Sequence, residues 1–119
     1  MQFKGPKDDA KYEWTAHVGD KMRFYGISES LIKRIIRFPK RVEEGIAPQT
    51  VAAMQPTSNK KKPQEIWVMY RTAGKPRIVA GVRLPPRKRI ISAWRYPGVS
   101  SKDRPVIPAD VLQDLLNEV

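Results

Sequence analysis

A short stretch near the end of the chain combines strand-forming residues with side chains that could do chemistry. Residues 90–98 read Ile-Ile-Ser-Ala-Trp-Arg-Tyr-Pro-Gly, so a strand is expected to end where Pro97 and Gly98 break it. Arg95 and Tyr96 lie at that end, where a planar guanidinium could hold a phosphate and a phenol could transfer a proton. The plainer alternative is a core strand with a solvated basic approach.

Basic residues crowd around this stretch and dominate the whole chain. The 119 residues include 23 Lys and Arg against 12 Asp and Glu, which gives a net charge of +11. Such a charge attracts polyanions through the release of their counterions, without sequence specificity. An anionic membrane surface is the rival partner, but we find no basic amphipathic helix with bulky aromatic anchors. We therefore predict a nucleic-acid interface that includes Arg83, Arg87, Lys88, Arg89 and Arg95.

A second set of reactive side chains lies near the N-terminus, on a helix predicted over residues 15–25. His17, the only histidine of the chain, and Lys21 are four residues apart, so they are neighbours on one helix surface. If Arg95 holds a phosphate, then Tyr96 or His17 could serve the proton steps while Lys21 adds positive potential. These four residues are the candidate catalytic set. A lone histidine is more often structural, which is the alternative interpretation.

Several classes of site are excluded by composition. The chain has no cysteine, so it has no disulfide and no thiolate chemistry, and one histidine cannot build an ordinary zinc site. Glu43 and Glu44 are adjacent on a predicted strand and should point to opposite faces, so they would not act as a pair. No phosphate-binding glycine loop or dinucleotide fingerprint is present. We expect a cationic site without metal or cofactor.

The elements that must position these side chains follow from periodicity and from helix breakers. Thr15 and Ser28 are expected to cap two helices, with Gly26 between them and Pro39 after the second. Helices followed by strands favour an α+β fold, with two N-terminal helices packed on an antiparallel sheet of four to five strands. Strands are predicted at 41–46, 50–55, 65–71, 77–82 and 90–96, and a last helix after Pro108. Lys33, Arg34 and Arg37 are interpreted as a solvated helix face.

The chain length and the absence of cysteine indicate one domain in a reducing compartment. Residues 1–13 are predicted to be a flexible arm, 14–98 the α+β domain, and 99–119 a linker with a C-terminal helix. No apolar run approaches the length of a membrane span and no signal peptide is evident, so we expect a cytoplasmic protein without membrane contact.

The order of these pieces resembles a small bacterial family of unknown function that is grouped with BrnT-like and RelE-like toxins. The resemblance covers residues 14–96 and rests on His17-x-x-x-Lys21-Met22, Gly26-Ile27-Ser28, a second helix ending at Phe38-Pro39, and Ile90-Ile91-Ser92-Ala93. It implies a RelE-like fold with a curled antiparallel sheet. It also implies a metal-independent endoribonuclease, an mRNA interferase, whose positions here would be His17, Lys21, Arg41, Arg95 and Tyr96. Arg41 thereby joins the predicted nucleic-acid interface. The run Trp94 to Gly98 and the C-terminal helix depart from the family pattern.

The function expected from charge and resemblance is RNA binding within a toxin–antitoxin pair. The implied partners are RNA, with ribosome-bound mRNA as one form, and an acidic antitoxin protein. The alternative is a non-catalytic basic module that binds structured RNA or an acidic protein. Oligomeric state and RNA sequence preference do not follow from these residues.

Overall fold

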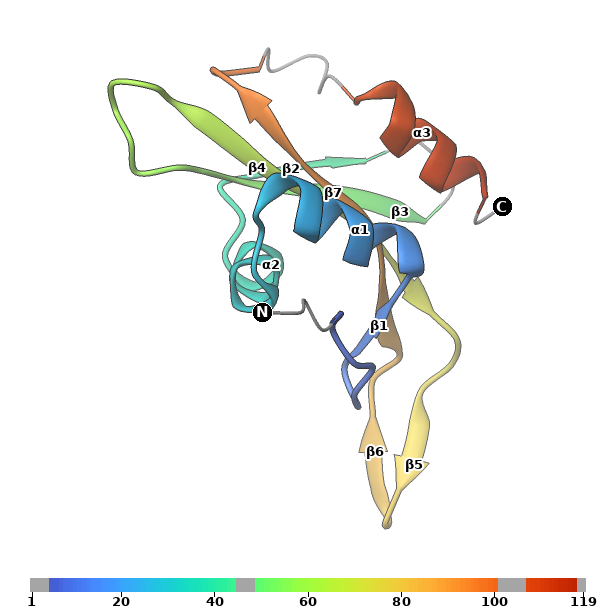
Figure 1. Ribbon diagram of the computed structural model, residues 1–119. Helices are drawn as coiled ribbons and strands as arrows, with labels where there is room; N and C mark the ends of the chain where they lie inside the picture. Colours follow the sequence, from blue (N-terminus) through green and yellow to red (C-terminus); the bar gives the residue numbers. More distant parts are fainter. Residues whose placement is uncertain (1–4, 45–48, 101–106, 118–119) are drawn as a thin grey trace.

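The protein is an α+β structure in which one sheet lies between helices (Figure 1). The computed structural model describes residues 5–44, 49–100 and 107–117. The main sheet has the strand order β1 (Tyr12–Trp14), β7 (Arg87–Pro97), β4 (Gln64–Ala73), β3 (Thr50–Pro56) and β2 (Arg41–Glu44). The remaining elements are α1 (Ala16–Tyr25), α2 (Glu29–Arg37), α3 (Ala109–Leu116) and a separate hairpin of β5 (Arg77–Val79) and β6 (Val82–Leu84).

The two N-terminal helices begin and end where the sequence predicts. The Thr15 side chain accepts a hydrogen bond from the Val18 amide and Ser28 accepts one from the Leu31 amide, so both N-caps are confirmed. Gly26 follows α1 with φ of 67°, the left-handed conformation that closes a helix at low cost for glycine. The sharp turn between the helices therefore has a local origin.

The sheet differs from the prediction at one edge. Strands β2, β3, β4 and β7 pair antiparallel, but β1 pairs with β7 in parallel, so the sheet is mixed. Tyr12 is buried in the core, and the Asp9 carboxylate accepts hydrogen bonds from the amides of Lys11 and Tyr12. Strand β1 has only three residues, which is too short to show strand periodicity, so the sequence did not predict a strand at the end of the arm. Residues 1–4 of that arm, 45–48 after β2 and 101–106 of the predicted linker lie outside the described residues.

Each face of the sheet buries its own apolar cluster. Ile66, Val68 and Tyr70 of β4 pack with α1 and α2, while Trp67 and Met69 pack on the side of α3. This alternation follows from the two-residue period of a strand, and it explains why β4 is apolar on both faces. Within the described ranges, no helix is long and apolar enough to cross a membrane.

A β-bulge in β7 joins the sheet to α1. Tyr70 pairs with Ile90 and Met69 with Ser92, so Ile91 is an extra residue in β7. The Ile91 carbonyl accepts a hydrogen bond of 2.7 Å from the Thr15 hydroxyl, the N-cap of α1. The bulge thereby fixes where α1 starts against the sheet.

The segment predicted as a strand over 77–82 is instead a two-stranded hairpin. Val79 pairs with Val82 across the turn residues Ala80 and Gly81, which have φ of 51° and 77°. Two consecutive positive φ angles are typical of a type I′ turn, which matches the twist of the flanking strands. The glycine that weakened the strand pattern is therefore the residue that allows the turn.

Replacing Ala80 with asparagine is expected to stabilise this hairpin. Alanine at φ of 51° is disfavoured, whereas asparagine tolerates the left-handed region. We therefore expect the free energy needed to open the hairpin to rise by about 0.5–1 kcal/mol. Amide hydrogen exchange of Val79 and Val82 measures this gain as slower exchange. Gly81→Ala is the control and should accelerate exchange. Unchanged exchange in Ala80→Asn would contradict the assigned turn.

Candidate nucleic-acid interface

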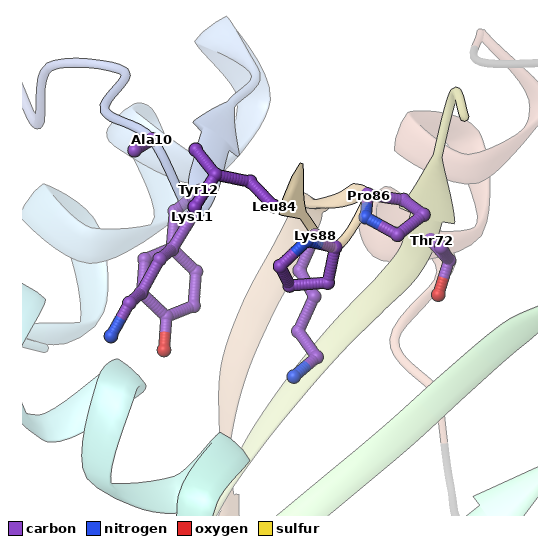
Figure 2. Close-up of a pocket in the computed structure, with 8 residues that line it drawn as sticks. Ala10, Lys11, Tyr12, Thr72, Leu84, Pro86 and Lys88 are labelled. Atoms are coloured by element: carbon purple, nitrogen blue, oxygen red, sulfur yellow. The ribbon is translucent and has the colours of Figure 1, made fainter. Parts of the chain in front are cut away.

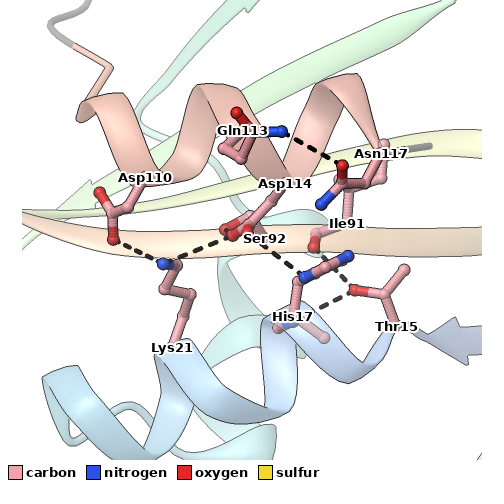
Figure 3. Close-up of polar contacts among 10 residues, drawn as sticks. Thr15, His17, Lys21, Ile91, Ser92, Asp110, Gln113, Asp114 and Asn117 are labelled. Atoms are coloured by element: carbon pink, nitrogen blue, oxygen red, sulfur yellow. Dashed lines mark hydrogen bonds and ion pairs between the residues drawn. The ribbon is translucent and has the colours of Figure 1, made fainter. Parts of the chain in front are cut away.

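His17 and Lys21 lie on the side of α1 that faces α3 (Figure 3). The Lys21 ammonium is 2.5 Å from a carboxylate oxygen of Asp110 and 3.6 Å from one of Asp114. The His17 Nδ1 atom is 3.3 Å from the other Asp114 oxygen. Two of the four candidate catalytic residues are thus engaged by acidic residues of the C-terminal helix.

Asp114 is the centre of this α1–α3 contact. Its carboxylate is buried and also accepts a hydrogen bond of 2.9 Å from the fully buried Ser92 hydroxyl. Burial alone would lower the pKa of Lys21, but the hydrogen bond from its ammonium to Asp110 and the charge of Asp114 outweigh burial, and the pKa is raised. The same hydrogen bond lowers the pKa of Asp110. The contact is therefore a set of ion pairs and hydrogen bonds, with Lys21–Asp110 among them, that holds α3 against the body.

Arg95 and Tyr96 lie on opposite faces of the sheet, because neighbouring side chains of a strand alternate. Arg95 donates from Nε and Nη2 to the Tyr25 carbonyl at 3.2 and 3.0 Å, and from Nη1 to the Gln64 side chain at 3.1 Å. Tyr96 packs on the α3 face beside Trp94. Both residues were expected to face α1, the helix that carries His17 and Lys21. Arg95 does contact the C-terminal end of α1, whereas Tyr96 lies on the other face of the sheet.

Arg95 instead shares a pocket with Arg34 of α2. The pocket has a volume of about 480 Å³. Arg34 donates from Nε to the Gln55 side chain at 3.3 Å, and Gln55 in turn donates to the Phe38 carbonyl at 2.7 Å. The residues that line the pocket are Leu31, Arg34, Gln55, Pro56, Thr57, Ser58, Ile66 and Arg95.

Within residues 5–44, 49–100 and 107–117, no carboxylate pairs with the two guanidinium groups of this Arg34–Arg95 pocket. Among the described residues, the hydrogen-bond acceptors of Arg34 and Arg95 are neutral carbonyl and amide oxygens. Two guanidinium groups held in place by neutral acceptors attract an anion, and their planar N–H donors suit phosphate oxygens. The Thr57 and Ser58 hydroxyls add donors, and Leu31 and Ile66 supply an apolar wall. The arrangement is chemically suited to a phosphate with an attached base.

The other predicted basic residues occupy separate places. Arg41 pairs with Glu43 at 2.6 Å, donates to Ser100, and lies over the Trp67 ring at 5.2 Å. Arg87 and Arg89 lie 3.5 and 3.4 Å from the Glu13 carboxylate of β1. Arg83 is exposed on β6, and Lys88 lines a further pocket at the base of the β5–β6 hairpin. The predicted cluster is thus split between ion pairs and open surface.

Arg34 and Gln55 were missed as site residues. Arg34 was interpreted as part of a solvated face, and its partner Gln55 lies 21 residues away on another element. No spacing rule joins these positions, because the contact depends on how α2 packs across β3. The only local signal is the polar loop after Pro56, which brings Thr57, Ser58 and Lys60 to Lys62 together.

Comparison with known proteins adds no relative: no protein-family model, no curated protein and no solved structure matches this chain significantly. The fold and the pocket define an α+β protein with a cationic cleft. The resemblance to BrnT-like and RelE-like toxins stays a hypothesis.

Proposed function

We propose that this protein binds RNA and holds a phosphate in the Arg34–Arg95 pocket. The observation that supports the proposal most is that two arginines line one pocket while bonding only to neutral acceptors within the described residues. The net charge of +11 would draw in a polyanion, and Lys60, Lys61 and Lys62 follow the pocket hydroxyls in the same loop.

RNA fits this pocket better than an inorganic anion does, because the pocket also has apolar walls. Leu31, Pro56 and Ile66 could contact an unstacked base while the arginines hold its phosphate. Unstacked bases are what single-stranded RNA and loops present. The basic charge on the rest of the surface would hold the adjoining nucleotides.

Binding is better supported at this pocket than cleavage. The residues that line it are arginine, glutamine, hydroxyl and apolar residues, without a side chain that transfers protons near neutral pH. The RelE-like arrangement, with two N-terminal helices on one sheet face, remains part of our proposal, as does an acidic antitoxin as partner. A cleavage function would need His17 or Tyr96 to reach an RNA held elsewhere on the surface.

Replacing Arg34 with glutamine is expected to weaken single-stranded RNA binding about tenfold, because a charge-assisted hydrogen bond to phosphate is lost. The salt dependence should also decrease, by about 0.7 in the logarithmic slope for one lost phosphate contact. Fluorescence anisotropy with a short labelled RNA, measured at about 50 and 200 mM salt, gives both quantities.

Arg37→Gln is the matched control, since Arg37 is an exposed arginine on α2 that does not line the pocket. Both variants lose one positive charge, so the overall electrostatic attraction for RNA decreases equally in the two. Any difference between their RNA affinities therefore reports on the pocket. Equal losses in the two variants would refute the pocket as the site. RNA cleavage that is lost in His17→Ala would favour the enzyme over the binding module.

A further inference from the structure

The β5–β6 hairpin projects away from the sheet and helices (Figure 1). Several of its apolar side chains are exposed. Ile78, Val79 and Val82 are 77%, 49% and 59% exposed. An isolated two-stranded hairpin is marginally stable in water, and exposed apolar groups on such an element often mark a contact surface. Contact with a partner would therefore explain why apolar side chains are exposed at the tip.

The charge around the hairpin identifies the kind of partner. Residues 71–88 contain no Asp or Glu, and their basic residues are Arg71, Lys75, Arg77, Arg83, Arg87 and Lys88, of which Arg87 is paired with Glu13. A surface with this composition complements a polyanion rather than a protein of mixed charge. Nucleic acid is the polyanion that also offers apolar surface, in the faces of its bases.

The pairing of the hairpin gives each face both kinds of side chain. Ile78 is opposite Arg83 on one face, and the other face has Val79 opposite Val82 and Arg77 opposite Leu84. Arg83 is exposed, so a cation accompanies the apolar tip. This layout matches a wedge whose tip contacts bases while its sides contact phosphates.

A pocket at the base of the hairpin extends the cationic surface (Figure 2). It has a volume of about 310 Å³ and includes Lys11 and Lys88 beside Tyr12, Leu84 and Pro86. Figure 2 shows the Lys11 and Lys88 side chains extending in the same direction beside the pocket. Phosphates flanking a base contacted by the tip would meet these ammonium groups.

We propose that the β5–β6 hairpin is a wedge for the double-helical part of a structured RNA. Its aliphatic tip would insert at a base-pair step or helix junction, while Arg83, Lys11 and Lys88 hold phosphates. Proteins that bend a double helix insert apolar side chains between base steps, and the hairpin exposes Ile78, Val79 and Val82. This inference rests on the proposed RNA binding but not on the Arg34–Arg95 pocket.

The test uses a stem-loop RNA with 2-aminopurine in the stem and the same sequence as an unpaired strand. Wild-type protein should increase 2-aminopurine fluorescence in the stem-loop, because insertion unstacks the base. The double variant Ile78→Ser, Val82→Ser should lose this increase and bind the stem-loop roughly tenfold more weakly, with unchanged salt dependence. Its binding to the unpaired strand should stay at the wild-type level.

Arg83→Gln is the charge variant and Arg34→Gln separates the two sites. Arg83→Gln should keep the fluorescence increase at saturation but reduce the logarithmic salt slope by about one. Arg34→Gln should weaken binding to the unpaired strand and leave the fluorescence increase with the stem-loop intact. A failure of the pocket proposal is therefore distinguishable from a failure of the wedge proposal. Because the substituted residues are exposed, the thermal midpoints should match the wild type.

Three results would overturn the wedge. The first is a double variant that binds the stem-loop as wild type does, and the second is a wild type that leaves 2-aminopurine fluorescence unchanged. The third is a wild-type dimer that the double variant converts to a monomer without loss of RNA affinity, which would assign the tip to a second copy of the chain.

Discussion

Replacing Trp94 with alanine is expected to lower the free energy of unfolding by about 3–5 kcal/mol, a large part of the stability of a small domain. Trp94 is completely buried on the α3 face and stacks on Trp67, with ring centroids 5.9 Å apart and planes 5° apart. Its removal leaves a cavity between β7, β4 and α3 that neighbouring strands cannot fill. Urea denaturation followed by circular dichroism measures the loss as a lower midpoint.

Phenylalanine substitutions at both tryptophans provide the control. The Trp67 indole N–H donates to the buried Glu65 carboxylate at 3.2 Å, whereas the buried Trp94 indole N–H has no partner within the described residues. Trp67→Phe removes a hydrogen bond to a carboxylate and should cost more than Trp94→Phe, which removes an unsatisfied donor. A larger loss of stability in Trp94→Phe than in Trp67→Phe would contradict the assignment of the hydrogen-bonded indole to Trp67.

Replacing Asp114 with alanine is expected to lower the free energy of unfolding by about 2–4 kcal/mol, because buried polar partners lose their acceptor. The Asp114 side chain is 9% exposed, and it contacts His17, Lys21 and Ser92 at once. Alanine leaves the fully buried Ser92 hydroxyl without this acceptor and removes one of the two carboxylates at Lys21. Urea denaturation near neutral pH gives the difference.

Asp110→Asn is the matched control for this contact. The Asp110 side chain is 50% exposed, so its ion pair with Lys21 is screened by water and its loss should cost less than about 1 kcal/mol. Similar losses in the two variants would show that burial of Asp114 does not matter.

The pH dependence of Asp110→Asn checks the sign of the same interaction. The Lys21 hydrogen bond lowers the pKa of Asp110, so the ionised carboxylate stabilises the fold above its usual pKa. That contribution is lost as the pH falls through the pKa of Asp110 in the folded protein. The difference in stability between wild type and Asp110→Asn should therefore shrink below about pH 4. A difference that grows in acid would contradict this assignment.

The sequence alone determined the elements whose signals are local. Thr15, Gly26 and Ser28 mark the ends of two helices, because caps act through backbone groups within four residues. The strong strand pattern of 65–71 became the two-faced strand β4, and the predicted last helix became α3. The α+β class followed from the order of these elements, and the cationic character followed from the count of charges.

Which of these side chains contact one another depends on how the elements pack. The spacing of His17 and Lys21 correctly placed them on one helix face, but it could not show that Asp114, far along the chain, occupies that face. The strand period separates Arg95 from Tyr96, and the packing of α2 over β3 brings Arg34 into the pocket of Arg95. Caps and turns depend on neighbouring residues, whereas a site depends on contacts between elements that are distant in sequence.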